Sequence, residues 1–330
     1  MRALRVRSHG EPAEALHLED VPAPDPGPGQ VRVRVHAAAL GLPDLLLCRG
    51  TYQLRPPLPF TPGLEAAGEV VALGPDVDRA LLARRVVGVP ALPDGALAEC
   101  TVIPARGVYP LPEAVDDATA AASHIAHLTA HVALHRRAGL QPGQTLLVHA
   151  AAGGTGAAAV QLGVLTGARV LATAGSNERV AVARDLGAAV GINYRSDDFV
   201  AAVQEATDGR GADVIFDPVG GDVFRASQRC VAPEGTILVV GFAGGDVQAI
   251  PAHRVLLGNH SVVGVYLGAY SRGDANRAFL LGVHDELMGL VATGRVRPLV
   301  SRRVGLDGVA GALEALRDRD VVGRVLVLPG

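Results

Sequence analysis

Several residue types are rare or missing in this chain of 330 residues. Lysine and tryptophan are absent, so all 30 basic residues are arginine, a bias that indicates genomic composition rather than function. The three cysteines, Cys48, Cys100 and Cys230, form no close pair, which excludes a zinc knuckle and a disulfide framework. Aromatic residues make up only 3% of the chain, so aliphatic side chains must build the core. Because the cysteines suggest no disulfide framework, we expect a protein of the reducing cytoplasm.

Long apolar runs are also missing. No segment reaches the roughly 18 uncharged apolar residues of a membrane span, and charges interrupt the apolar runs near the N-terminus. The net charge of -3, with 19% charged residues, leaves no basic patch for nucleic acid. We expect no membrane or nucleic-acid partner, no signal peptide, and a small-molecule substrate. The length suggests about two domains.

The sequence pattern changes near residue 115. Residues 2–113 contain short β-type runs separated by proline and glycine, with little sign of helix. From Asp116 onward, strand-like and helix-like segments alternate, which is typical of βαβ units in a parallel sheet. The strand candidates are residues 145–150, 169–174, 213–217, 236–240 and 261–265. The chain is thus predicted to be an α/β protein with a β-rich first part.

Helices are expected around these strands. They cover residues 116–137, 157–166, 178–186, 274–293 and 306–318, and a closing strand lies within residues 322–328. Gly187 is expected to end the helix over residues 178–186. Ser196 is predicted to cap a further helix that carries Asp197 and Asp198 in its first turn.

The sharpest motif is VHAAAGGTGAAAVQL, which begins at residue 148. It places Ala150, Gly153 and Gly156 in an A-x-x-G-x-x-G pattern between a predicted strand and a predicted helix, with Gly154 and Thr155 inside it. Small residues let the backbone approach a pyrophosphate and leave the N–H groups of the helix N-terminus to bind it. The alternative is a glycine-rich turn that binds nothing, but the strand, motif and helix occur in the expected order.

The end of the next strand indicates which nucleotide binds. NAD-binding proteins carry an acid there that accepts a hydrogen bond from the ribose 2′-hydroxyl. This chain has Gly175 and Ser176 instead, followed by Arg179, a combination that favours the 2′-phosphate of NADP(H). The alternative makes Ser176 only a helix cap and Arg179 a solvated residue, and Glu178 reduces the local positive charge.

Five motifs occur in a familiar order: GLEAAGEV, AAAGGTGAAAVQLG, TAGSNERVAVARDLGA, DPVGGD and VVGFAGG. In this order they resemble the medium-chain dehydrogenase/reductase superfamily, and within it the zinc-independent NADPH:quinone oxidoreductases related to zeta-crystallin. The resemblance covers essentially the whole chain. It implies a GroES-like, β-rich catalytic domain formed by residues 1–122 and 269–330, and a Rossmann cofactor domain with a doubly wound parallel sheet over residues 123–268.

The resemblance also indicates that zinc is absent. The superfamily's alcohol dehydrogenases ligate catalytic zinc at three positions that are occupied here by Gly41, Leu64 and Ala121, none of which can coordinate a metal. The four-cysteine structural lobe is missing as well. Asp44 and Glu65 remain, and we expect them to be structural hydrogen-bonding residues. Without this Lewis acid, the expected chemistry is hydride delivery to an acceptor that is already electrophilic.

The cofactor residues implied by the resemblance lie between residues 129 and 266. Thr129 matches a threonine near the nicotinamide, and Tyr52 matches a tyrosine at the mouth of the substrate pocket. The pyrophosphate turn is matched by Gly153, Gly154, Thr155 and Gly156, and the 2′-phosphate contacts are matched by Ser176 and Arg179. The adenosine phosphate site is matched by Tyr194. The nicotinamide ribose segment is matched by Gly241, Phe242 and Ala243, and the carboxamide segment by Val265 and Tyr266.

Two departures from the family pattern concern the substrate pocket. Gly41 stands where the family usually has asparagine, and His124 and His127 replace a usual proline and tyrosine. His124 and His127 belong to a four-histidine stripe on one helix face, with His131 and His135. Such a stripe suits metal binding, proton transfer or plain packing, and we interpret it as mainly structural, with His127 as a candidate proton donor.

The sequence therefore predicts an NADPH-dependent, zinc-independent oxidoreductase that reduces a quinone or another α,β-unsaturated carbonyl compound. A 2-alkenal or enoyl-thioester reductase is the alternative within this class, with Arg49 and Arg55 beside Tyr52 as a basic entrance. A catalytically weak NADPH-binding sensor or structural protein is the alternative outside it. The run that begins at Ser261 resembles an edge strand that pairs with its copy in family dimers, so we expect a homodimer.

Overall fold

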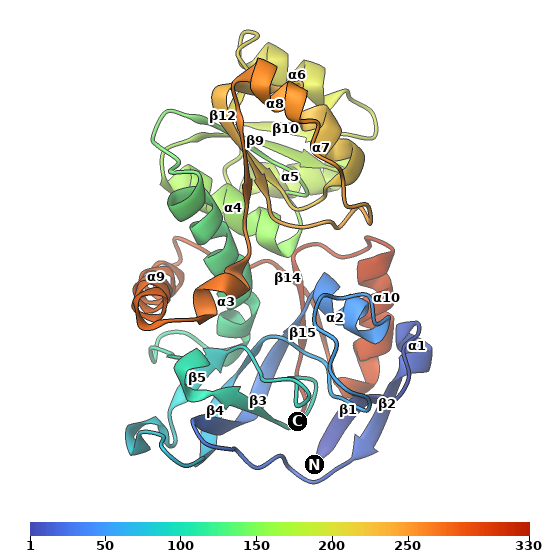
Figure 1. Ribbon diagram of the computed structural model, residues 1–330, viewed down its shortest axis with the longest axis vertical. Helices are drawn as coiled ribbons and strands as arrows, with labels where there is room; N and C mark the ends of the chain where they lie inside the picture. Colours follow the sequence, from blue (N-terminus) through green and yellow to red (C-terminus); the bar gives the residue numbers. More distant parts are fainter. The chain divides into compact units, whose positions relative to one another are not determined.

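The computed structural model describes residues 1–330 and divides into two compact units, each visible in Figure 1. Unit 1 combines Met1–Ile125 with Gly273–Gly330, and unit 2 is Ala126–Arg272. No helix in the structure is both long and apolar enough to cross a bilayer.

Unit 1 is built on a sheet of seven strands in the order β14-β15-β3-β4-β5-β7, with β6 pairing to β3. The strand that comes first along the chain, β3, shows why one face of this sheet is apolar. Val31, Val33 and Val35 are buried, and Arg32 and Arg34 alternate with them and point to the other face. The strands are β3 (Gln30–Leu40), β4 (Ala66–Leu73), β5 (Arg85–Gly88), β6 (Cys100–Pro104), β7 (Val108–Pro110), β14 (Val300–Val304) and β15 (Arg324–Val327).

The C-terminal segment completes this sheet. β15 pairs antiparallel with β3, with Val325 opposite Leu40, so the end of the chain adds strands to the fold begun by residues 30–40. The helices α2 (Leu42–Cys48) and α10 (Val309–Arg317) contribute Leu45, Leu47 and Leu313 to one aliphatic core. Unit 1 also contains α1 (Pro12–Ala15), β1 (Arg2–Val6), β2 (Leu16–Asp20), α9 (Asp274–Ala292) and the first part of α3 (Asp117–His131).

Unit 2 is a six-stranded parallel sheet in the order β10-β9-β8-β11-β12-β13. The predicted parallel sheet is confirmed. Its strands are β8 (Thr145–Val148), β9 (Arg169–Ala174), β10 (Val190–Asn193), β11 (Ala212–Asp217), β12 (Val231–Val239) and β13 (Ser261–Gly264), connected by the helices α4 (Gly154–Leu165), α5 (Asn177–Asp185), α6 (Phe199–Ala206), α7 (Gly221–Ser227) and α8 (Ala252–Gly258).

The strand order places a topological switch point between β8 and β11. The chain proceeds from β8 to β9 and β10 on one side, and from β11 to β12 and β13 on the other. In sheets of this kind, ligands bind beyond the carboxyl ends of the strands at such a point. The fingerprint turn follows β8 directly, so it lies at the switch point.

Two local predictions need correction. Ser196 does not cap the helix that follows it: α6 begins at Phe199, and the Asp198 carboxylate accepts from the N–H groups of Val200 (2.8 Å) and Ala201 (3.4 Å). The helix expected over residues 116–137 is α-helical only in α3 (Asp117–His131) and continues as a π-helix over Val132–Arg137.

Candidate cofactor and substrate site

The predicted cofactor residues of unit 2 share one position in the fold. Each group follows the carboxyl end of a strand, and because all six strands are parallel, these ends meet at one edge of the sheet. The exception is Thr129, which lies on α3, as does the candidate proton donor His127. The groups are residues 153–156 after β8, 176 and 179 after β9, 194 after β10, 241–243 after β12, and 265–266 after β13.

The fingerprint turn has the geometry of a phosphate cradle. Ala150 adopts φ 51°, and its carbonyl accepts from the Gly153 N–H at 2.9 Å. A Cβ at Gly156 would lie 2.2 Å from that same carbonyl oxygen, so only glycine allows the helix to approach so closely. Gly153 occupies the N-cap position of α4 but has no side chain to bond the free N–H groups, and the first turn of α4 contains no acidic residue. These residues therefore fit an anionic pyrophosphate at an uncapped helix N-terminus.

Ser176 has the capping role that was the alternative to phosphate binding. It is the N-cap of α5, and its Oγ accepts from the Arg179 N–H at 3.4 Å. A hydrogen bond with Ser176 also lowers the pKa of the exposed Glu178 carboxyl. The hydroxyl carries one proton, so Ser176 can keep its capping bond but can donate to a phosphate only in place of Glu178.

Gly175 lies against Tyr194, which explains the missing acid at this position. A Cβ at Gly175 would be 2.7 Å from Tyr194 Oη and 3.6 Å from Arg195 Nε, so the phenol and the guanidinium fill the space of a larger side chain. Asn193 donates to Asn177 Oδ1 at 2.9 Å, which fixes the end of β10 to the start of α5. The structure thus brings Ser176, Tyr194 and a second arginine to one loop cluster.

The loops after β11 and β12 are joined by backbone contacts. The Ala243 N–H donates to Pro218 O at 3.0 Å, and Asp217 Oδ1 accepts from the N–H groups of Val219 (2.8 Å) and Gly220 (2.9 Å). Phe242, in the same loop, is 40% exposed. After β13, Val265 is buried and donates to Val239 O at 2.9 Å, whereas Tyr266 is 56% exposed.

The histidine stripe is divided between different surroundings. His131 and His135 pack with tilted rings whose centroids are 4.6 Å apart, whereas His124 packs against Tyr109 (4.7 Å) and His284 (5.6 Å) in unit 1. His127 is only 2% exposed, and Thr129 is half-buried. No group of three or more histidine, cysteine, aspartate or glutamate side chains is arranged to hold a metal ion. The proton-donor role of His127 stays a prediction.

In unit 1, the positions that match zinc ligands lie beside a buried charge network. The Glu65 carboxylate accepts from the Ile125 N–H at 2.6 Å and pairs with the Arg324 guanidinium, and Asp44 accepts from the Gly41 N–H at 2.8 Å. Burial raises the pKa of Asp44 to about 6 and that of Glu65 to about 7. These bonds give both acids the structural role expected for them. Leu64 and Ala121 contribute only apolar surface.

Tyr52 follows the end of α2. Its N–H donates to Leu46 O at 3.2 Å, and its half-buried side chain packs against the aliphatic core of unit 1. Packing and a role at a pocket mouth are compatible for a ring that keeps part of its surface exposed.

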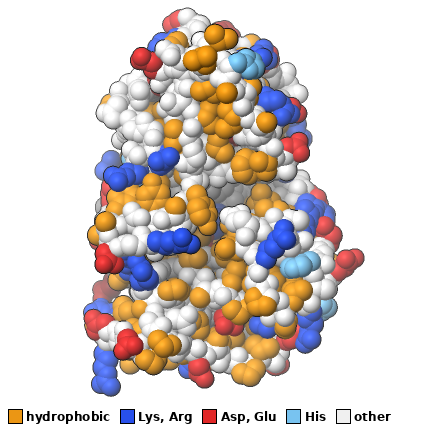
Figure 2. Space-filling model, in the orientation of Figure 1, with side chains coloured by type: hydrophobic (Ala, Val, Ile, Leu, Met, Phe, Trp, Pro, Cys, Tyr) orange, Lys and Arg blue, Asp and Glu red, His pale blue; other side chains and the backbone are white.

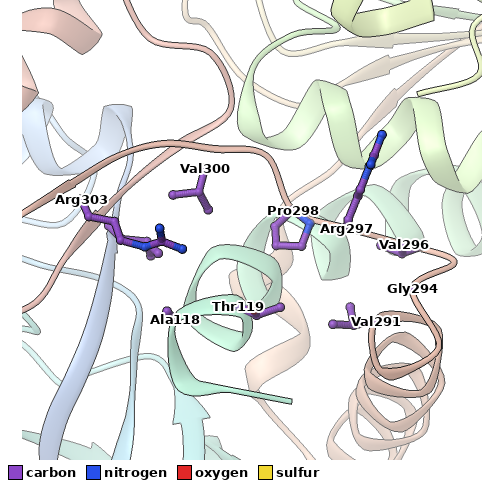
Figure 3. Close-up of a pocket in the computed structure, with 10 residues that line it drawn as sticks. Ala118, Thr119, Val291, Gly294, Val296, Arg297, Pro298, Val300 and Arg303 are labelled. Atoms are coloured by element: carbon purple, nitrogen blue, oxygen red, sulfur yellow. The ribbon is translucent and has the colours of Figure 1, made fainter. Parts of the chain in front are cut away.

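Each unit also has a cavity that sequence reasoning did not single out. In unit 1, a cavity of about 350 Å³ lies beside the first turn of α3 and the segment before β14. Figure 3 shows Arg303 extending toward Ala118 and Val300, whereas Arg297 extends away from them. In unit 2, a cavity of about 400 Å³ is lined by residues of α5 and β10, among them Val180, Arg184 and Asn193. Neither cavity contains a fingerprint residue.

Sequence reasoning missed two sets of residues near the fingerprint. Arg195 directly follows the predicted Tyr194, so its position in the sequence was a usable signal. His149, Thr173 and Ser227 form a buried hydrogen-bonded group, and their separation in sequence hides the contact.

The parallel sheet, its switch point and the glycine cradle define a dinucleotide-binding oxidoreductase fold. Residues 27–113 match the family described as the alcohol dehydrogenase GroES-like domain, and residues 154–280 match the zinc-binding dehydrogenase family. Quinone oxidoreductase-like protein 2 from Bos taurus is 37% identical over 327 residues, which is 99% of this chain and 93% of the relative. Quinone oxidoreductase from Pseudomonas aeruginosa is 34% identical and is covered to 99%, as is this chain.

A solved structure agrees with these relatives. Escherichia coli quinone oxidoreductase, complexed with NADPH, superimposes with a TM-score of 0.93 at 30% identity, and each chain is covered completely. This chain belongs to the quinone oxidoreductases of the medium-chain dehydrogenase/reductase superfamily. The resemblance seen in the sequence motifs is confirmed.

Proposed function

We propose that the protein is an NADPH-dependent, zinc-independent reductase of quinones or other α,β-unsaturated carbonyl compounds. In this proposal, unit 2 is the cofactor domain and unit 1 the catalytic domain. The observation that carries it is the loop cluster at Gly175, where Tyr194 and Arg195 fill the space of the acid that NAD-binding proteins use. The Escherichia coli relative, whose structure is complexed with NADPH, supports the same choice.

The nucleotide preference follows from charge. Arg195 Nε lies 3.6 Å from the Cβ position of Gly175, and Arg179 belongs to the first turn of α5. In this proposal both arginines attract the 2′-phosphate, and position 175 holds no carboxylate to repel it. Glu178 is the one acid in the first turn of α5. NADH offers only a neutral 2′-hydroxyl, which lacks its usual acidic acceptor here.

Independence from zinc is supported by the residues at the ligand positions. Gly41, Leu64 and Ala121 offer no donor atom, and Asp44 and Glu65 are already engaged with backbone N–H groups and Arg324. An alcohol substrate needs a Lewis acid to lower the pKa of its hydroxyl, whereas a quinone or an enone accepts hydride directly.

The chemistry balances without a metal. Bound NADPH supplies a hydride, and the acceptor gains that hydride and one proton, giving NADP⁺ and a hydroquinone or a saturated carbonyl compound. The chain's part is to position the two partners and to meet the negative oxygen that develops on the acceptor. Tyr52 is the proposed partner of that oxygen, and His127 or solvent is the proposed proton source.

The test is the initial rate of NADPH and NADH oxidation against a quinone, a 2-alkenal and an enoyl thioester, each with and without a chelator. We expect turnover that prefers NADPH and is unchanged by the chelator, and the best acceptor then names the subclass. Chelator-sensitive turnover or a preference for NADH would contradict the proposal.

The sensor or structural reading is the second candidate, and Gly41 is the observation that favours it. In the family, an asparagine side chain at this position belongs to the substrate pocket, and here that side chain is missing. Tight NADPH binding without turnover on any acceptor would support this reading. Gly41→Asn is then the variant to test for a gain of activity.

We also propose a cytoplasmic homodimer. All three cysteines are free thiols, as expected in a reducing compartment. β13 is an edge strand of the sheet, and Leu256 and Leu257 on the neighbouring α8 are 77% and 82% exposed. Figure 2 shows hydrophobic side chains on the face of unit 2 that carries α8. Light scattering that reports a monomer would contradict the dimer.

A further inference from the structure

His149 connects three elements at the base of the fingerprint. It directly follows β8, and its ring is 1% exposed. Its Nδ1 lies 3.0 Å from Thr173 Oγ1 on β9, and its Nε2 lies 2.9 Å from Ser227 Oγ at the end of α7. The ring also packs edge-on against Phe199, with centroids 5.0 Å apart.

The hydrogen-bond partners fix where the ring proton resides. The Ser227 hydroxyl donates to Val223 O at 2.8 Å, so its oxygen is left to accept from His149 Nε2–H. His149 Nδ1 then accepts from the Thr173 hydroxyl. Burial lowers the pKa of His149 to about 4, and the ring is therefore neutral near pH 7.

The residue after His149 is strained. Ala150 adopts φ 51°, a left-handed conformation that is unfavourable for a residue with a Cβ. Such a conformation persists only where the surroundings fix it. The backbone on both sides of Ala150 is anchored: the His149 N–H donates to Phe216 O (3.1 Å), and the Ala151 N–H donates to Thr173 O (3.0 Å).

Thr173 contacts the chain on both sides of Ala150. Its hydroxyl holds the His149 ring, and its carbonyl holds the Ala151 N–H. It also lies two residues before Gly175, where the loop that faces the 2′-phosphate begins. The pyrophosphate turn and the 2′-phosphate loop are thus connected through one imidazole and one threonine.

We propose that His149 is a positioning residue for the dinucleotide. Its neutral ring ties β8 to β9 and α7, holds Ala150 in the left-handed conformation, and so presents the turn over residues 150–156 to the pyrophosphate. This inference rests on the proposed function, because the dinucleotide is the ligand in both.

The first experiment measures the dissociation constant of NADPH by fluorescence for His149→Phe and Thr173→Val. One lost hydrogen bond is worth about 1 kcal/mol, so Thr173→Val should weaken NADPH binding about fivefold, and His149→Phe should weaken it more. Thr207→Val is the matched control. Its hydroxyl donates to Val203 O at 2.7 Å at the end of α6, so it should lose stability in urea but keep its affinity for NADPH.

The second experiment separates positioning from plain core packing. Ala150→Gly removes the strain that the anchors must hold, so it should leave wild-type affinity nearly unchanged. In the His149→Phe background, it should restore most of the lost affinity. A double variant that binds as weakly as His149→Phe alone would overturn the inference. If His149→Phe does not fold, the same comparison is made with Thr173→Val.

A third readout needs no cofactor. Nitrogen NMR of histidine-labelled protein should show His149 as the Nε2–H tautomer, with no titration between pH 8 and pH 5.5. An Nδ1–H tautomer or an ordinary titration would overturn the inference. If wild type binds no NADPH, the proposed function fails. If wild type binds NADPH and the His149 and Thr173 variants bind it equally well, only this inference fails.

Discussion

Tyr194 shows how the identity of one residue depends on another in this chain. Its Oη lies 2.7 Å from where a Cβ at Gly175 would be, so an acid at position 175 would require the phenol to move. The sequence showed the missing acid and the nearby arginine. It did not show the contact between Gly175 and Tyr194, because 18 intervening residues separate them and only the adjacency of β9 and β10 brings them together.

His124 illustrates a residue whose surroundings the sequence concealed. Helical spacing grouped it with His127 and His131, but tertiary packing placed it with Tyr109 and His284. Burial lowers the pKa of His124 well below its usual value, and burial also lowers the pKa of His284. The nearby Arg277, which lies 4.6 Å over the Tyr109 ring, lowers both pKa values further.

A pH prediction follows for His124. A histidine of the unfolded chain takes up a proton near pH 6.5, whereas folded His124 resists it, so the folded state loses stability as the pH falls below about 6.5. The loss is at most about 1.4 kcal/mol per pH unit for one such group. His124→Phe should therefore lose less free energy of unfolding than wild type between pH 7 and pH 5, as measured by urea unfolding.

The pH dependence of stability must be compared between wild type and variants, because other groups change the stability in the opposite direction as the pH falls. Burial raises the pKa of Asp44 and Glu65, so the folded state takes up their protons first and gains stability as the pH falls. These carboxyl groups contribute equally to the pH dependence of the free energy of unfolding in wild type and in His124→Phe. His17→Gln, at an exposed site, is the control and should keep the wild-type pH dependence. Parallel pH profiles for wild type and His124→Phe would refute the prediction.

At the scale of secondary structure, five of the six strands of unit 2 were predictable, whereas β10 and the helix ends were not. Continuous apolar runs predicted β8, β9, β11, β12 and β13, because buried parallel strands are hydrophobic on both faces. β8 ends at Val148 rather than residue 150 because Ala150 enters the left-handed turn. The short α2 and the π-helix over Val132–Arg137 carry no clear periodic signal.

The cap of α6 gives a prediction at this scale. Both Ser196 and Asp198 are good cap residues, but only Asp198 accepts from the first-turn N–H groups. Asp198→Ala should therefore lower the free energy of unfolding by about 1 kcal/mol. Ser196→Ala should change it by less than about 0.5 kcal/mol. Urea unfolding monitored by circular dichroism measures both, and equal effects would show that the cap is wrongly assigned.

At the scale of the whole molecule, the order of motifs predicted more than any single element did. The fingerprint between a strand and a helix, followed by alternating strands, was enough for the parallel sheet of unit 2. The return of the C-terminal segment to unit 1 came only from the family resemblance, because no local pattern in residues 322–328 says that β15 pairs with β3. Charge pairs such as Glu65 with Arg324 arise from that return.

The central claim is that this oxidoreductase uses NADPH, and equilibrium binding tests it most directly. Dissociation constants for NADPH and NADH are measured by fluorescence for wild type, Arg179→Ala and the control Arg184→Ala, which changes an exposed arginine further along α5. Wild type should prefer NADPH, and Arg179→Ala should weaken NADPH about tenfold or more because a charge-assisted hydrogen bond is lost, while NADH binding stays nearly unchanged. Equal affinities of wild type for the two nucleotides, or equal losses in Arg179→Ala, would contradict the account.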